Sequence, residues 1–191
     1  MTILNIHGYQ GNPKNSAYSA LCEIGCKNII SPSIDYDSEE PDSIISRLNL
    51  LRVKHNVNLV VGTSLGGFYA SILSARYNLP VMLVNPCLTP FLLDLLSELK
   101  TRPLMRLFGE LTKIECANVS CIVGGSDEVI GNHAFTEKLL GNARFCRIEG
   151  GKHSGATLPL KEYFSETLDY YKKTLPLIDA APSIPPDILD D

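Results

Sequence analysis

The chain has 191 residues, of which 45% are hydrophobic, enough to bury a substantial core without help from metals or disulfides. The chain has 17 Lys and Arg residues and 21 Asp and Glu residues. The resulting net charge of −4 argues against a protein that binds nucleic acid by neutralising its phosphates. No apolar run approaches the roughly 18 residues of a membrane span and no basic signal region opens the sequence, so we expect a cytoplasmic protein without a membrane partner.

Short apolar runs alternate along the chain with segments of helical periodicity. The runs predict strands at residues 3–6, 28–30, 59–61, 81–84, 119–123 and 144–148. Apolar residues at helical spacing predict helices at residues 16–24, 42–54, 65–76, 91–105, 134–140 and 159–173. This alternation predicts an α/β fold with about six mostly parallel strands and helices on both faces, in a single domain over residues 1–175. Ligands of such sheets bind beyond the carboxyl ends of the strands.

Residues 176–191 differ in composition from the rest of the chain. They contain four prolines and four aspartates, which predicts an extended or disordered acidic tail. The six cysteines show neither the paired spacing of a zinc site nor the density of a disulfide scaffold. We expect them to be reduced thiols, mostly in the core, and we expect no bound metal.

A glycine-rich turn lies between the third predicted strand and the helix that follows it. Residues 62–67 read Gly-Thr-Ser-Leu-Gly-Gly, the GxSxG pattern in the strand–turn–helix setting of a nucleophile elbow. A side chain at Gly62 or Gly66 would collide with neighbouring backbone, and the strained turn pushes Ser64 out above the sheet. We therefore predict that Ser64 is a nucleophile. The alternative is a glycine-rich turn without catalysis.

A serine nucleophile needs a histidine base, which follows it in the chain order of this fold class. His7 and His55 precede Ser64 and fail that order. His153 stands in a glycine-rich loop directly after the last predicted strand, where it can reach over the serine. We predict His153 as the base, with His133 as the rival and a solvent-facing loop histidine as the other alternative.

The base needs an acid that orients it, expected in the loop after the fifth strand. Asp127 is the first carboxylate after that strand, and the two glycines before it permit a tight turn. We predict Asp127 as this acid, and the adjacent Glu128 is its rival.

An oxyanion in the transition state needs at least two N–H donors placed in advance. The N–H of Leu65 lies next to the nucleophile at the start of a helix. The N–H of Tyr9 follows the His7-Gly8 pair after the first strand, and this pair is expected to shape the backbone without transferring protons.

Three stretches together resemble a known family: IHGYQGNPKNSAYSAL near the start, VVGTSLGGFYASILSARYNLPVMLVNPCLTP in the middle, and GGSDEVI followed by GGKHS. They are similar to the YqiA/YcfP-type (UPF0227) small bacterial esterases, over most of residues 3–172. The resemblance implies an α/β-hydrolase fold, hydrolysis of carboxylic esters, and Ser64, Asp127 and His153 as the triad. The chain departs from the family pattern in a compressed segment at 88–115 and in its acidic tail.

In this fold class the chain after the fourth predicted strand commonly forms a cap over the active site. Residues 88–118 are enough for about two short helices, so we expect a short cap. Its apolar residues line an acyl pocket or merely pack on the body: Phe91, Leu92, Leu95, Leu96, Leu104, Leu107, Phe108 and Leu111. Its cations attract an anionic substrate or form a solvated face: Lys100, Arg102, Arg106 and Lys113.

These features favour a serine hydrolase of short-chain carboxylic esters or thioesters that works through an acyl-enzyme and needs no cofactor. Its partner would be a small-molecule ester or thioester. The same triad also suits an amidase or peptidase. A third alternative is a non-catalytic binding module whose partner contact is the tail at 176–191.

Overall fold

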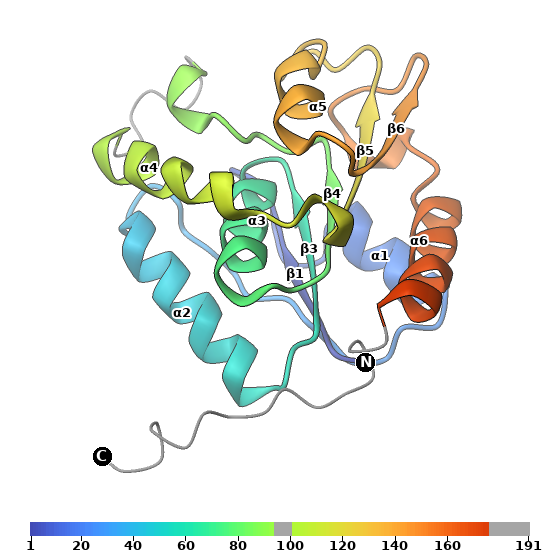
Figure 1. Ribbon diagram of the computed structural model, residues 1–191, viewed down its shortest axis with the longest axis horizontal. Coiled ribbons are helices and arrows are strands. Elements are labelled where there is room, and N and C mark those ends of the chain that lie inside the picture. Colours follow the sequence, from blue (N-terminus) through green and yellow to red (C-terminus); the bar gives the residue numbers. More distant parts are fainter. Residues whose placement is uncertain (94–100, 176–191) are drawn as a thin grey trace.

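The computed structural model describes residues 1–93 and 101–175, and in this part of the chain six parallel strands form one sheet (Figure 1). The strands are β1 (Ile3–Ile6), β2 (Ile29–Ile30), β3 (Leu59–Thr63), β4 (Val81–Val84), β5 (Val119–Gly124) and β6 (Arg144–Ile148). They lie in the order β2-β1-β3-β4-β5-β6. The predicted parallel α/β architecture is confirmed, and the predicted tail at 176–191 lies outside the described residues.

The four central strands are buried on both faces because helices cover both sides of the sheet. Every residue of β1 and β4 is buried, as are all those of β5 and all but the last of β3. Near-continuous apolar runs such as Val-Met-Leu-Val in β4 are typical of strands in a covered parallel sheet. The edge strand β6 exposes Arg144, Cys146 and Arg147.

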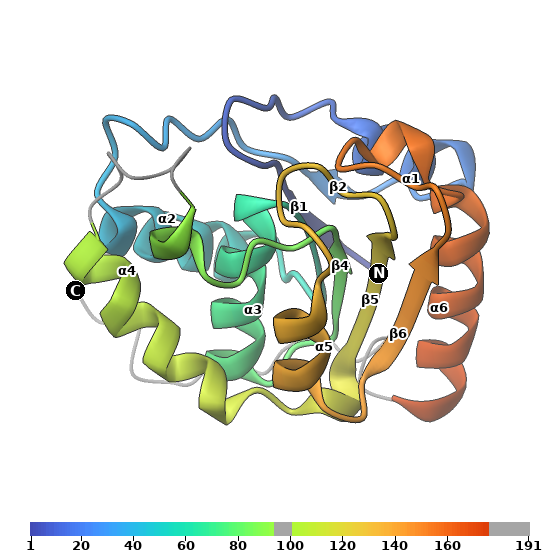
Figure 2. The same ribbon diagram turned by 90° about the horizontal axis from the view of Figure 1, so that it is seen from above.

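Two helical layers enclose this sheet (Figure 2). The helices are α1 (Ser16–Glu23), α2 (Pro41–Lys54), α3 (Leu65–Tyr77), α4 (Thr101–Phe108), α5 (Ala134–Leu140) and α6 (Leu160–Thr174). Helices α1 and α6 pack on one face of the sheet, and α2, α3, α4 and α5 pack on the other. None of the helices in the described ranges is long and apolar enough to cross a membrane.

The predicted helix at 91–105 is wrong at its start and confirmed at its end. A short 3₁₀ turn, η1 (Pro90–Leu92), is followed by Leu93 in an extended conformation, whereas residues 101–105 lie in α4 (Thr101–Phe108). Residues 94–100, which include Leu95, Leu96 and Lys100, lie outside the described residues.

The described part of the expected cap is fastened to the body of the protein. Leu104, Leu107 and Leu111 are buried in the core cluster that also contains α2 and α3. Arg106 pairs with Asp42 in the first turn of α2, and Arg76 at the end of α3 forms two hydrogen bonds with Glu110, at 2.6 and 2.7 Å. Arg106 therefore neutralises a carboxylate of the body, and the three leucines pack as ordinary core residues.

All six cysteines are free thiols, but the expectation that most lie in the core is wrong. Cys87 and Cys121 are buried, whereas Cys22 and Cys146 are exposed and Cys26 and Cys116 are half-buried. Burial raises the pKa of Cys87 to about 12, so its reactive thiolate is scarce near neutral pH.

We expect a thiol reagent to distinguish these classes at about pH 8. Cys22 and Cys146 should react first in the native protein, whereas Cys87 and Cys121 should react only after unfolding, because their sulfurs are shielded from the reagent. Titration with Ellman's reagent, before and after denaturant is added without reductant, measures both sets. Fewer than six thiols in the denatured protein after anaerobic purification would contradict the assignment.

Candidate active site

The turn between β3 and α3 holds Ser64 in a conformation that its neighbours impose. Ser64 has φ 52° and ψ −123°, in the positive-φ region that non-glycine residues rarely adopt. A Cβ at Gly62 would approach the Cβ of Ala70 and the carbonyl oxygen of Gly66 to 2.6 Å, and a Cβ at Gly66 would collide with the backbone of Ile6. Both glycines are therefore required for the tight turn that presents the serine side chain.

Three side chains from separate parts of the chain lie in hydrogen-bond contact at the carboxyl edge of the sheet. His153 Nε2 lies 3.0 Å from Ser64 Oγ. On the other side of the ring, His153 Nδ1 lies 2.9 Å from Asp127 Oδ2 and 3.1 Å from Oδ1. The carboxylate is fully buried, and the imidazole is about one-fifth exposed. These are the residues selected from the sequence, and their catalytic roles stay a prediction.

Asp127 is surrounded by hydrogen-bond donors. Its Oδ1 accepts the backbone N–H groups of Val129 at 2.9 Å and Ile130 at 2.8 Å, and its Oδ2 lies 2.8 Å from His133 Nε2. Burial alone raises the pKa of the Asp127 carboxyl group, but the hydrogen bonds from His133, His153 and the Ile130 N–H outweigh it and hold the pKa well below its usual value. The carboxylate is therefore ionised throughout the neutral range.

The two rival residues occupy other places. Glu128 is exposed, and its Oε2 accepts the backbone N–H of His153 at 3.2 Å rather than contacting the ring. His133 is buried against Asp127, and no hydrogen bond joins it to Ser64 in the described part of the chain. Neither rival lies where the predicted acid or base would have to act.

The loop after β1 passes directly beside Ser64. A Cβ on Gly8 would approach Ser64 Cβ to 2.8 Å, so only glycine fits this position. The buried His7 ring fixes the loop: its Nε2 accepts the Ile34 N–H at 3.0 Å, which leaves the proton on Nδ1 to donate to the Gly8 carbonyl oxygen at 2.8 Å. Both ring nitrogens of His7 are thus occupied by hydrogen bonds to backbone groups. The donor roles of Tyr9 and Leu65 stay a prediction.

Asn85 is a residue of this edge that the sequence reasoning missed. It follows β4, is fully buried and has φ 43°. Its Nδ2 donates to the carbonyl oxygens of Lys152 at 2.9 Å and His153 at 2.8 Å, and its Oδ1 accepts the Gly124 N–H at 2.7 Å. One amide therefore ties the ends of β4 and β5 to the histidine loop. An asparagine directly after a buried strand was the available signal.

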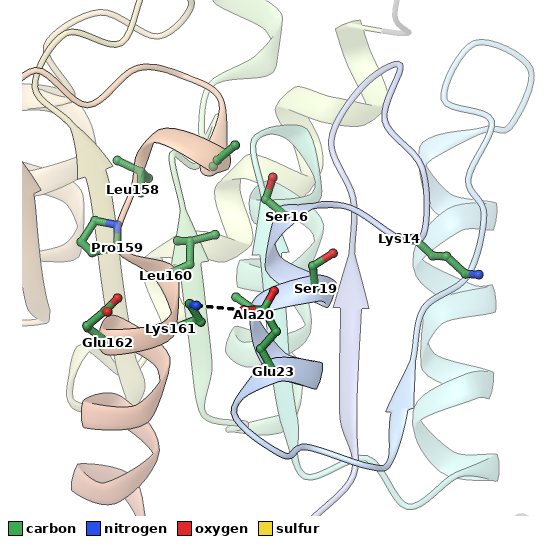
Figure 3. Close-up of a pocket in the computed structure, with 12 residues that line it drawn as sticks. Lys14, Ser16, Ser19, Ala20, Glu23, Leu158, Pro159, Leu160, Lys161 and Glu162 are labelled. Carbon is green, nitrogen blue, oxygen red and sulfur yellow. Dashed lines mark ion pairs between the residues drawn. The ribbon is translucent and has the colours of Figure 1, made fainter.

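Two hollows lie near this edge of the sheet. A cavity of about 90 Å³ lies between the loop after β4 and the start of α5, and Cys87, Ile130, His133 and Phe135 are among its lining residues. A larger hollow of about 470 Å³ lies between α1 and the start of α6 (Figure 3). An ion pair of 2.9 Å between Lys161 and Glu23 crosses it, and no predicted triad residue lines it.

Comparisons with known proteins identify the family and the fold. The family model described as "Uncharacterised protein family (UPF0227)" matches residues 2–121, which include Ser64 but neither Asp127 nor His153.

In the described residues, no group of three or more His, Cys, Asp or Glu side chains is arranged to hold a metal ion.

Solved structures with the same arrangement are distant in sequence. One, from work on LipS and LipT, two metagenome-derived lipolytic enzymes, has a TM-score of 0.71 at 13% identity and covers 90% of this chain and 93% of that chain. MGS-MChE2, an alpha/beta hydrolase enzyme from a sediment metagenome of the Mar Chica lagoon, Morocco, has a TM-score of 0.61 at 14% identity, with 91% of each chain covered. Est1E from Butyrivibrio proteoclasticus has a TM-score of 0.58 at 18% identity, with 88% of each chain covered. The chain belongs to the UPF0227 family and has the α/β-hydrolase fold.

Proposed function

We propose that the protein is a serine hydrolase that cleaves short-chain carboxylic esters or thioesters through an acyl-enzyme intermediate. The observation that carries this proposal is the chain of hydrogen bonds from Ser64 Oγ through His153 to the buried Asp127. The lipolytic enzymes among the structures of the same fold favour an ester substrate.

The chemistry follows from the three contacts. Ser64 Oγ–H donates to His153 Nε2, which takes the proton as Oγ attacks the substrate carbonyl carbon. His153 Nδ1–H donates to Asp127, whose negative charge stabilises the imidazolium that forms. When the tetrahedral intermediate collapses, the bond to the alcohol or thiol breaks, His153 returns the proton to it, and the acyl group stays on Ser64. A water molecule then attacks in the same way and releases the carboxylic acid.

Backbone N–H groups would hold the oxyanion of the two tetrahedral intermediates. Leu65 is the first residue of α3, and the first N–H groups of a helix lack a partner within it. The loop that carries Tyr9 lies against Ser64, as the close approach at Gly8 requires. Loss of one such donor typically slows acyl transfer by about 10²–10³-fold.

Labelling with a fluorophosphonate probe tests the proposal directly. The probe reacts with an activated serine, so we expect covalent attachment to Ser64, located by mass spectrometry of the digested protein. Ser126→Ala is the matched control, because this exposed serine stands next to Asp127 and has no proposed role. No labelling of the native protein, or labelling that survives Ser64→Ala, would contradict the proposed function.

We expect activity to peak at acyl chains of about two to six carbons and to fall for longer ones. In the described part of the 88–118 segment, Leu104, Leu107 and Leu111 pack against the body and are not free to line an acyl pocket. A series of p-nitrophenyl esters of increasing chain length measures this preference. A maximum at about twelve carbons or more would refute the size argument.

A further inference from the structure

Two histidines share one oxygen of the Asp127 carboxylate. His133 Nε2 lies 2.8 Å from Oδ2, and His153 Nδ1 lies 2.9 Å from the same atom. The His133 side chain is fully buried, and the residue precedes α5 with φ 53°. An imidazole on the far side of the acid plays no part in the transfer of protons between His153 and Ser64, so the geometry calls for a separate explanation.

The hydrogen-bond partners determine which nitrogen of His133 carries a proton. An ionised carboxylate only accepts hydrogen bonds, so Nε2 of His133 must be the protonated donor. Its Nδ1 is buried and has no hydrogen-bond partner in the part of the chain that the structure describes. A proton on this nitrogen as well would bury an N–H without an acceptor, which is costly. The ring is therefore suited to donating one hydrogen bond, to Asp127.

The other charged or titratable groups around this cluster leave that donor role intact. Glu128 contacts the backbone N–H of His153, and Cys87 lines the cavity beside His133 from the loop after β4. Arg147 of β6 donates to the backbone carbonyl oxygen of the residue before His133, at 2.6 Å. Asp127 supplies the hydrogen bond that the structure records for the His133 ring.

We propose that His133 is a positioning residue that holds Asp127 Oδ2 in place and divides the negative charge of that oxygen between two imidazoles. This inference rests on the proposed function. A carboxylate oxygen with two donors is fixed in position, and it attracts the proton on His153 less strongly than an oxygen with one donor. Loss of His133 should therefore disturb the orientation of His153 and also make its protonation easier.

Two substitutions separate these effects from a general loss of packing. In His133→Asn the amide is too short to reach Asp127, but asparagine tolerates the positive φ of this position. In His133→Gln the amide nitrogen takes the place of Nε2 and restores a donor. His55→Asn, at the end of α2, is the matched control for replacing a histidine.

The measurements are profiles of kcat and of kcat/KM for a short ester from about pH 5 to 9, together with the downfield proton resonance of His153 Nδ1–H. For His133→Asn we expect kcat to fall about tenfold with little change in KM. A fall of about tenfold is the effect expected from the loss of one hydrogen bond. The acid limb of the kcat/KM profile should move up by about half a pH unit, and the resonance should shift. His133→Gln should restore all three, and His55→Asn should change none of them.

The outcomes separate failure of this inference from failure of the proposed function. Profiles of His133→Asn that superimpose on those of the wild type would overturn the role of His133 while leaving a Ser64-dependent hydrolase intact. Equal impairment in both His133 variants, with the acid limb unmoved, would reduce His133 to a packing residue and also overturn it. If the wild type turned over no ester, the resonance alone would decide, because a shift reversed by His133→Gln supports the shared carboxylate and an unmoved resonance refutes it.

Discussion

Replacement of Ser64 by alanine should lower turnover of a short-chain p-nitrophenyl ester by about 10⁴-fold or more, because no other group in the proposed mechanism forms the acyl-enzyme. The fold should stay intact. The serine side chain is at the surface of a turn that positive φ already strains, and alanine meets the same backbone conformation without adding atoms. The free energy of unfolding should therefore change little.

Stopped assays at high enzyme concentration and a thermal melt measure the two parts of this prediction. Ser126→Ala, purified in parallel, should keep full activity and excludes a contaminating esterase as the source of turnover. Ser64→Ala activity above about one-tenth of the wild type would rule out the proposed nucleophile.

Asp127→Asn should lower kcat by about 10⁴-fold, as expected when the acid no longer fixes the tautomer of the base. Two backbone N–H groups and two imidazoles donate to this carboxylate. An asparagine amide nitrogen has no lone pair for them, so at least one buried donor loses its acceptor. We expect a further cost of about 1–3 kcal/mol in the free energy of unfolding.

The stability difference between wild type and Asp127→Asn should depend on pH. The pKa of Asp127 in the folded protein is lowered below its unfolded value, so its carboxylate stabilises the fold above about pH 4. This contribution is lost as the pH falls towards the pKa of the folded state, so the difference should shrink in acid. Denaturant titrations at several pH values measure it. Glu128→Gln is the control, and an equal loss of kcat in that variant would exchange the roles of the two carboxylates.

Local patterns predicted most of this fold. The apolar runs of the buried strands mark their positions to within two residues, and the turn at Ser64 is recognisable because its glycines, serine and following helix are adjacent in the chain. The start of the helix predicted at 91–105 is wrong, since the helical spacing of its apolar residues suits a helix where the structure has a 3₁₀ turn followed by the extended Leu93. Helical spacing alone does not reveal where a chain must break.

The supporting contacts of the site were harder to predict because their partners are remote in sequence. Asn85 binds the carbonyl oxygens of residues 67 and 68 positions away, and no spacing rule relates them. His133 was considered only as a rival base, although it lies six residues from Asp127. Its role depends on how the loop turns at residues 127–133, where a bridge joins Asp127 to Gly131 and the backbone at His133 is left-handed.

The hydrogen bonds of Asn85 have a consequence for how the site withstands local opening. The loop with His153 follows β6, an edge strand that pairs only with β5 in the described part of the chain, and such edges are the first parts of a sheet to fray. Asn85 stands instead at the end of β4, between two neighbouring strands near the middle of the sheet. Asn85 thus ties the backbone of His153 to the interior of the sheet, and we expect amides of β6 to exchange with solvent while the histidine keeps its place beside Ser64.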